Sequence, residues 1–194
     1  MSKIHEKLIL GHLDYQNSLE EERHYLIDLA INGQKPHTMF IGCCDSRVIP
    51  EQFTNSKPGE LFVIRNIGNH VPKYKNSIDS MESAIIYAIK YLSVQHIVIC
   101  GHTNCGGITA KNNLKNNIVK DNDEYLLDKW IMNLKPSVEE NVLNSLTNII
   151  DYPIIKKNLD SKKIILHAWI YDLENVCLKI WNGKDWLSAS DIKI

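Results

Sequence analysis

The sequence predicts an α/β fold: a mainly parallel sheet of four strands plus an antiparallel fifth, flanked by helices. Three short apolar runs, at residues 38–42, 61–64 and 97–100, each end in a polar loop, as buried parallel strands do. Residues 79–92 carry a helical apolar stripe before the third run. This alternation favours a doubly wound sheet with right-handed crossovers.

Two further apolar runs complete the predicted sheet. Residues 163–170 form the fourth strand, and residues 176–181 form the fifth. The connection between them is too short for a crossover, so the fifth strand is antiparallel to the fourth.

The chain length of 194 residues, with 44% hydrophobic and 23% charged residues, fits a single domain spanning residues 1–194. Residues 1–33 form an N-terminal helical arm, and residues 34–194 form an α/β core with a helical excursion at about 106–160. Two helical pieces are predicted within the arm, with Gly11 as the break and Asn32-Gly33 as the stop.

The flanking elements follow from local signals. A short turn of helix is predicted at 48–51, and a turn at 57–60 leads into the second strand. Asp79 and Glu82 resemble a capping box at the start of the 79–92 helix. Within the excursion, apolar spacing predicts helices at 125–134 and 138–150.

Charge and composition exclude several partners. Lys and Arg total 22 against 23 Asp and Glu, so the formal charge of −1 provides no basic field for nucleic acid. No apolar run approaches a membrane span, and the N-terminus has no signal-peptide pattern. Five cysteines, an odd number with two adjacent, make a poor disulfide framework and suit a reducing compartment. We therefore expect a cytoplasmic protein.

Polar residues with metal-binding side chains follow two of the predicted strands. Cys43, Asp45 and Arg47 come after the first strand, and His102 and Cys105 after the third. In an open parallel sheet both loops emerge at the carboxyl edge, where such folds place their ligands. Two thiolates and one imidazole suit Zn²⁺, and a fourth position left to water would make the site catalytic.

Simpler interpretations exist for each of these residues. A lone cysteine beside a strand is more often a small buried hydrophobe, and Cys44, Cys100 and Cys177 are interpreted as core. Arg47 has the alternative of an ordinary surface ion pair, but its place two residues after Asp45 favours orientation of that carboxylate. The remaining histidines are interpreted as surface or structural residues: His5, His12, His24, His37, His70, His96 and His167.

The segments 43–47 and 101–107 resemble the two signature motifs of the β-class carbonic anhydrases. The resemblance extends from Gln34 to Ile108 and resumes at 167–172, where the family usually has glycine in place of Ala168. Cys44 also departs from the family pattern, which has Ala, Ser or Val there, and is expected to be a spectator.

The resemblance implies a zinc site and a substrate cleft. Cys43, His102 and Cys105 would hold Zn²⁺, and Asp45 would either pair with Arg47 or take the fourth coordination position. The lining of the cleft for CO2 and bicarbonate is implied for four residues: Gln34, Phe62, Tyr87 and Gly106. The family cleft lies across a dimer interface, which implies a homodimer or homotetramer whose N-terminal helices pack on a partner subunit.

The implied activity is reversible hydration of carbon dioxide to bicarbonate and a proton, as in a carbonate dehydratase. Zinc lowers the pKa of bound water from 15.7 to about 7, and the resulting hydroxide attacks the carbon. Asp45 would accept the hydrogen of the zinc-bound oxygen. The alternatives are a CS2 or COS hydrolase on the same zinc site, and a non-catalytic zinc-stabilised scaffold; Asp45, Arg47 and Gln34 together argue against the scaffold.

The resemblance also bears on inhibition. Some members of the family bind bicarbonate beside a Trp, Arg and Tyr cluster; Arg65 and Tyr171 match it, but the Trp position is Phe40. Phenylalanine lacks the indole N–H donor, which predicts weak or absent inhibition by bicarbonate.

Overall fold

The computed structural model describes residues 2–20, 22–114 and 122–192. The chain divides into two compact units, Met1–Gln34 and Lys35–Ile194, and each is described by itself. In the part of the chain that is described, no helix is both long and apolar enough to cross a bilayer.

The first unit contains two helices, α1 (Lys3–Ser18) and α2 (Glu22–Asn32). Helix α1 runs through Gly11, so the predicted break there is wrong. Leu8, Ile9, Leu10 and Leu13 surround this glycine with residues that favour or tolerate helix and offset its cost of about 1 kcal/mol. The predicted stop is confirmed, because α2 ends at Asn32 and Gly33 has a φ of 81°. Among the described residues of α1 and α2, none is buried.

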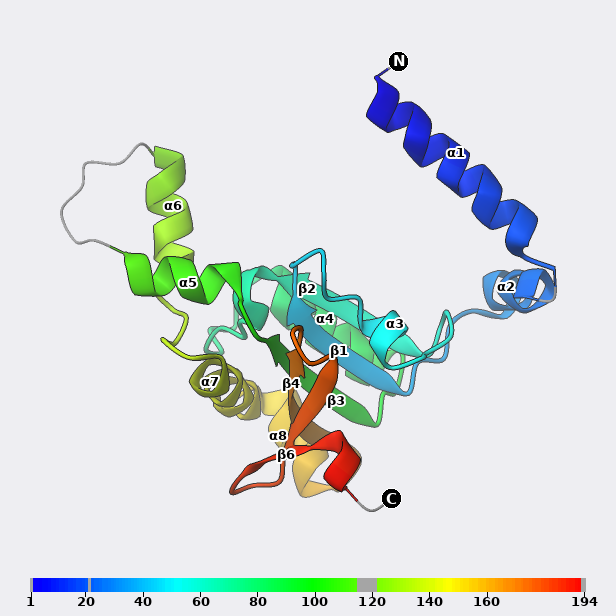
Figure 1. The fold of residues 1–194 in the computed structure, drawn as a ribbon. Helices are drawn as coiled ribbons and strands as arrows, with labels where there is room; N and C mark the ends of the chain where they lie inside the picture. The colour runs from blue at the N-terminus through cyan, green and yellow to red at the C-terminus, as the bar shows by residue number, and fades with distance from the viewer. Residues whose placement is uncertain (1, 21, 115–121, 193–194) are drawn as a thin grey trace. The chain divides into compact units, whose positions relative to one another are not determined.

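The second unit is built on a six-stranded sheet with the order β2-β1-β3-β4-β5-β6 (Figure 1). The strands are β1 (Thr38–Cys43), β2 (Leu61–Asn66), β3 (His96–His102), β4 (Ile165–Asp172), β5 (Cys177–Trp181) and β6 (Trp186–Ser188). Strands β1 to β4 pair in parallel, whereas β5 and β6 are antiparallel. The predicted parallel sheet and the antiparallel fifth strand are confirmed.

The sixth strand was not predicted. Strand β6 is three residues long, too short to show an alternating pattern. It is placed by a turn in which the side-chain oxygen of Asn182 accepts hydrogen bonds from the backbone N–H groups of Lys184 and Asp185.

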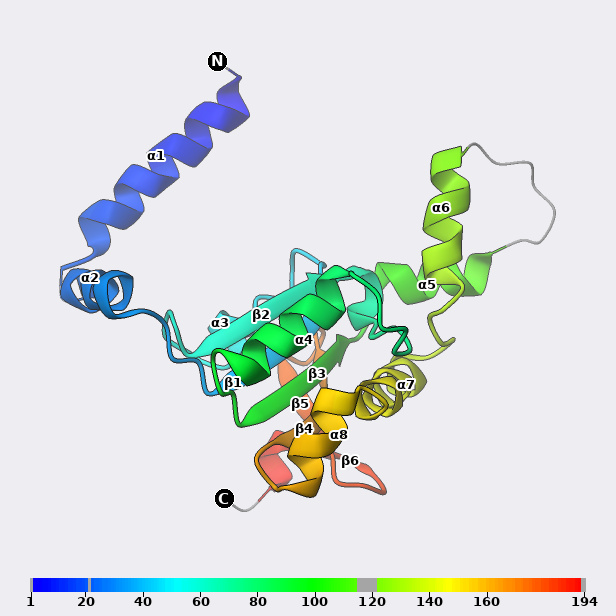
Figure 2. The same ribbon diagram turned by 180° about the vertical axis from the view of Figure 1, so that it is seen from behind.

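The helices of this unit are α3 (Pro50–Phe53), α4 (Ser80–Lys90), α5 (Gly106–Asn113), α6 (Asn122–Ile131), α7 (Val138–Ile150) and α8 (Pro153–Asp160), with short 3-10 turns η1 (Ile67–Asn69) and η2 (Ala189–Asp191). Figure 2 shows α4, α7 and α8 on the same side of the strands, and their apolar side chains form the main core with those of β1, β3 and β4.

The opposite face carries a smaller cluster. Phe40, Val98 and Cys100 are buried there, under Phe53 of α3 and Trp169 of β4. Successive residues of β1 and β3 belong alternately to the two clusters, as expected for a sheet that is apolar on both faces.

The predicted helix start at Asp79 is confirmed with one difference. The Asp79 carboxylate accepts a hydrogen bond from the N–H of Glu82 at 2.8 Å. In a capping box the Glu82 carboxylate would accept a hydrogen bond from the backbone N–H of Asp79. It accepts one instead from the N–H of Ser77, two residues before Asp79, at 3.2 Å.

The helical excursion contains the predicted helices as α6 and α7, together with α5 and α8, which were not predicted individually. Residues 115–121 of the excursion lie outside the described residues.

One prediction about the remaining cysteines needs correction. Cys100 is buried and Cys177 half-buried, but Cys44 is exposed, because it lies just beyond the end of β1 rather than within it. Among the histidines interpreted as surface or structural residues, His96 and His167 pair with each other through ring nitrogens 3.0 Å apart.

Candidate metal centre

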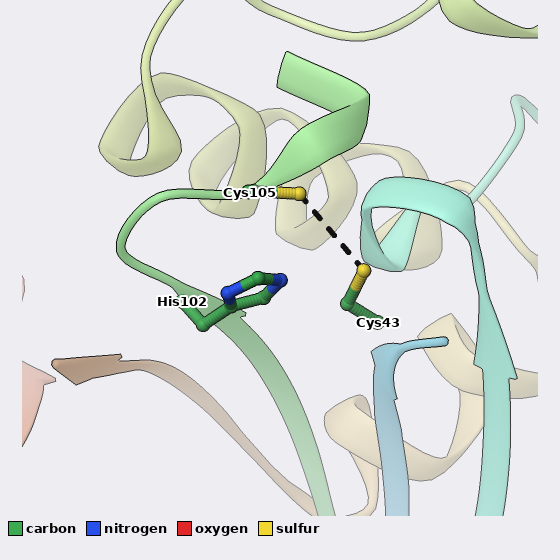
Figure 3. Close-up of side chains that lie close together, drawn as sticks. All are labelled: Cys43, His102 and Cys105. Carbon is green, nitrogen blue, oxygen red and sulfur yellow. Dashed lines mark hydrogen bonds between the residues drawn. The ribbon is translucent and has the colours of Figure 1, made fainter. Parts of the chain in front are cut away.

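Three side chains from two neighbouring strands meet at the carboxyl edge of the sheet. Cys43 is the last residue of β1, His102 is the last residue of β3, and Cys105 precedes α5 as its N-cap. Strands β1 and β3 are parallel neighbours, so their ends lie side by side. Figure 3 shows the three side chains pointing toward a common point.

The spacing of these side chains fits a tetrahedral zinc ion. The Sγ atoms of Cys43 and Cys105 are 3.9 Å apart, and ligand atoms of all three residues lie within 4.8 Å of one another. Two thiolates at the usual zinc–sulfur distance in tetrahedral geometry would be about 3.8 Å apart. All three residues are buried, with exposed fractions of 5%, 0% and 3% for Cys43, His102 and Cys105.

His102 is oriented as a metal ligand. Its Nδ1 lies 2.9 Å from the carbonyl oxygen of Thr103, so Nδ1 carries the proton and donates it there. Its Nε2 is buried and has no hydrogen-bond partner among the described residues. A buried ring nitrogen with a free lone pair is costly unless it binds a cation.

The contact between the two thiols shifts their pKa values in opposite directions. The hydrogen bond with Cys105 lowers the pKa of the Cys43 thiol, while the same contact, together with burial, raises the pKa of Cys105. One sulfur therefore ionises easily and the second retains its proton. A bound cation favours loss of that remaining proton, since the thiolate is the form that binds metal.

Asp45 lies beside the group and is held by Arg47. The guanidinium donates from Nε to Oδ1 at 2.9 Å and from Nη2 to Oδ2 at 2.8 Å, and the Arg47 backbone N–H donates to Oδ1 at 3.0 Å. The hydrogen bond from the Arg47 side chain holds the pKa of Asp45 well below its usual range. Asp45 Oδ2 is 3.8 Å from His102 Nε2.

Backbone contacts fix the loop that carries Cys43 and Asp45. Arg65 donates from Nε to the Cys43 carbonyl oxygen at 2.8 Å and from Nη2 to the Asp45 carbonyl oxygen at 2.7 Å. Arg47 also donates to the carbonyl oxygen of Asn104 at 3.1 Å, which ties the two loops together. This supporting role of Arg65 was not predicted. It could have been inferred from the position of Arg65 near the carboxyl end of the strand next to β1.

The proposed cleft residues lie apart from this group within the chain. Phe62 and Tyr87 stack with ring centroids 5.8 Å apart. Phe62 pairs with Met39, whereas Cys43 pairs with Asn66, so four residues of strand, about 13 Å, separate Phe62 from the metal-binding end.

The other two cleft candidates are exposed. Gly106 is the first residue of α5, directly after Cys105, with open space where a side chain would be. Gln34 is the last residue of the first unit.

Comparisons with known proteins identify relatives along most of the chain. A family model described as carbonic anhydrase matches residues 38–178. A carbonic anhydrase of Helicobacter pylori is 33% identical over 189 residues, covering 85% of this chain and 85% of that protein. Carbonic anhydrase 1 of Escherichia coli O157:H7 is 35% identical over 192 residues, covering 91% of this chain and 88% of that protein.

Solved structures agree with these sequence relatives. The structure of the β-carbonic anhydrase CcaA superposes with a TM-score of 0.84 at 29% identity, covering 96% of this chain and all of that one. One of two tetrameric β-carbonic anhydrases from the ascomycete Sordaria macrospora superposes with a TM-score of 0.76 at 26% identity, covering 92% of this chain and 96% of that one.

Proposed function

This chain belongs to the β-class carbonic anhydrase family, whose zinc enzymes interconvert carbon dioxide and bicarbonate, and we propose that Cys43, His102 and Cys105 hold the zinc ion. The observation that carries this assignment is the convergence of three buried ligand atoms within 4.8 Å, one of them the unpartnered Nε2 of His102. When bound, zinc supplies Lewis-acid activation of a water molecule for attack on carbon dioxide.

Asp45 and Arg47 act beside the metal in this proposal. Arg47 holds both carboxylate oxygens, so Asp45 presents an ionised acceptor in a fixed orientation at the edge of the site. The Asp45 carboxylate accepts a hydrogen bond from the reacting water and directs the lone pair of the water toward the substrate. Gly106 leaves the adjacent space open to a small molecule.

The cleft is completed by a second copy of the chain. Because Phe62 lies about 13 Å along the strands from the metal-binding end of its own chain and stacks with Tyr87, we assign both rings to the metal centre of a partner subunit. We assign them the apolar wall of the cleft and Gln34 the amide that bonds an oxygen of bicarbonate. The tetrameric relatives from Sordaria macrospora support an assembly of this kind, as a homodimer or homotetramer.

The N-terminal arm fits such an assembly. Ile4 and Leu8 of α1 and Ile31 of α2 are at least 70% exposed. Residues 1–33 thus form an arm that packs on the partner subunit, and residues 34–194 form the catalytic core of a single functional domain.

We propose a cytoplasmic location, and the thiol chemistry supports it. All five cysteines are free, and the two proposed zinc ligands have sulfur atoms 3.9 Å apart. Oxidation of that pair would remove the metal site, and a reducing compartment would preserve it.

The assignment is tested by single substitutions at the ligands. Cys43→Ser, His102→Ala and Cys105→Ser should each lose bound zinc and reduce carbon dioxide hydration to background, whereas Cys177→Ser should retain both. Zinc content by elemental analysis and stopped-flow hydration with a pH indicator provide the readouts. A zinc-loaded wild-type protein without hydration activity, but with turnover of CS2 or COS, would replace the proposed substrate and leave the zinc site intact.

A further inference from the structure

A cavity of about 450 Å³ lies in the second unit, between the segment that follows η1 and the connection from α6 to α7. Ten residues line it, among them His70, Lys73, Lys75, Trp130, Lys135 and Asn144. None of the proposed zinc ligands is among them. The cavity is therefore a separate feature of the molecule.

The charge of this cavity is uniformly positive. Lys73 and Lys75 come from the segment after η1, and Lys135 comes from the turn before α7. Within residues 2–20, 22–114 and 122–192, the ammonium groups of these lysines make no ion pair, and no lining residue is acidic. All three lysines are exposed, and their charges together make the potential over the cavity favourable to an anion.

Neutral donors accompany the lysines. The Asn144 side chain lines the cavity and makes no hydrogen bond to another described residue. An amide N–H₂ group offers two donors to an oxyanion. The lining is thus rich in donors, as a site for oxygen-rich anions requires.

His70 provides an independent indication of a ligand. Its side chain lines the cavity and is only 4% exposed, yet its Nδ1 has no hydrogen-bond partner in the described chain. The ring is held edge-on against Trp130, at 5.5 Å between centroids, and the Trp130 indole is fixed by donating to the Ile67 carbonyl oxygen at 2.9 Å. A fixed, buried and unpaired ring nitrogen is costly without a partner.

We propose that this cavity binds a phosphate dianion, supplied either as inorganic phosphate or as the phosphate group of a small metabolite. The lysines bind it as point charges, and the Asn144 amide and the His70 imidazole bond its oxygens. A dianion gains from all three lysines at once, so it is favoured over a monocarboxylate. The volume exceeds what a lone phosphate fills, which leaves space for an attached organic group.

The test is calorimetric titration of the zinc-loaded, full-length protein with inorganic phosphate and, separately, with adenosine monophosphate. We expect saturable binding with one site per chain that weakens as ionic strength rises. Tighter binding of the nucleotide would identify a phosphate ester as the source, and equal binding would identify phosphate itself.

Paired variants locate the binding. Lys73→Ala/Lys135→Ala should weaken it roughly tenfold or more, because two of the three charges are removed. Lys156→Ala/Lys157→Ala, an equal charge change on α8, should alter it by less than about twofold. His70→Gln should weaken it several-fold with an unchanged circular dichroism spectrum.

Three results would overturn the proposal. Absence of saturable binding would exclude the site. Equal weakening in both lysine pairs would indicate attraction to the general surface charge. Unchanged affinity in Lys73→Ala/Lys135→Ala would place the anion elsewhere, for example at the metal.

Discussion

Arg47 binds the carboxylate of Asp45 with two parallel hydrogen bonds, Nε to Oδ1 at 2.9 Å and Nη2 to Oδ2 at 2.8 Å. The same guanidinium reaches the carbonyl oxygen of Asn104, so it connects the loops that follow β1 and β3. Although the Arg47 side chain is 54% exposed, this geometry distinguishes it from an ordinary surface ion pair. The orientation of the Asp45 carboxylate beside the metal ligands therefore depends on Arg47, whereas Arg65 holds the backbone of the same loop.

Arg47→Ala should lower the turnover number about 10–100-fold at every pH, while zinc content remains unchanged. Without its bidentate partner the Asp45 carboxylate loses its orientation, and its pKa should rise toward the ordinary range. Stopped-flow kinetics and a carboxyl NMR titration provide the two measurements. Arg47→Lys, which keeps the charge but not the paired geometry, should be intermediate; a variant with wild-type turnover would show that orientation of Asp45 is dispensable.

Activity is expected to rise with pH if Asp45, which the family resemblance gives as an alternative fourth ligand, competes with hydroxide for zinc. Protonation of Asp45 itself does not explain such a rise. Its folded-state pKa is depressed, so its stabilising contribution is present above the unfolded pKa of about 3.9 and is lost only as pH falls below that. X-ray absorption at about pH 6 and about pH 9 should show a change of the fourth ligand. An identical coordination sphere at the two pH values would exclude an exchange of the fourth ligand.

The shared cleft can be tested by mixing inactive chains. Phe62→Ala/Tyr87→Ala should reduce activity although Phe62, on which Tyr87 stacks, lies about 13 Å along the strands from the metal-binding end of its own chain. A mixed dimer with Cys43→Ser should recover activity, because the chain that keeps zinc then receives Phe62 and Tyr87 from its partner. If Phe62 and Tyr87 act on the metal centre of their own chain, the mixed dimer will not recover activity. A stable, active monomer in sedimentation would contradict the homodimer or homotetramer.

Bicarbonate should inhibit weakly or not at all. Phe40 is 1% exposed and packs edge-on against Phe53, whose ring stacks on Tyr171 with centroids 4.4 Å apart, so the residue at position 40 supplies no indole donor. The indole of Trp169 also packs edge-on against Phe40, but it belongs to β4 and not to the position that matches the family's Trp. Arg65 already donates to the backbone of Cys43 and Asp45. Initial rates over a bicarbonate series would detect inhibition, with Phe40→Trp as the companion variant. Strong cooperative inhibition of the wild type would refute the prediction.

Asn141→Ala should destabilise the core by about 1–3 kcal/mol for each buried group that it leaves unpaired. Asn141 is fully buried and donates to the Gly68 carbonyl oxygen at 2.7 Å, while its Oδ1 accepts from the Lys135 N–H at 3.0 Å. Urea unfolding measures the change. The matched control is Asn144→Ala, on the same helix, whose side chain makes no hydrogen bond to another described residue; it should change stability by less than about 0.5 kcal/mol.

Local signals were sufficient where a segment is long and periodic. Helix α7 occupies the predicted residues 138–150, and the Asp79 cap lies where its spacing with Glu82 indicated. Predictions from local signals failed where the contact that forms the element is not local. Strand β6 is only three residues long, and it forms by antiparallel pairing with the edge strand β5. Gly11 does not end α1, because helix propensity is a sum over neighbours rather than a property of one residue.

The sequence alone determined which atoms can bind the metal, because two cysteines and a histidine at the ends of two parallel strands must emerge at one edge. Only the tertiary structure decided how these atoms are presented. The orphaned Nε2 of His102 depends on a backbone carbonyl, the bracing of the Cys43 loop depends on Arg65 from the adjacent strand, and the distance of Phe62 from the metal depends on strand register. The first depends on local backbone geometry, and the other two depend on contacts between residues far apart in the chain. The spacing of residues along the sequence encodes none of the three.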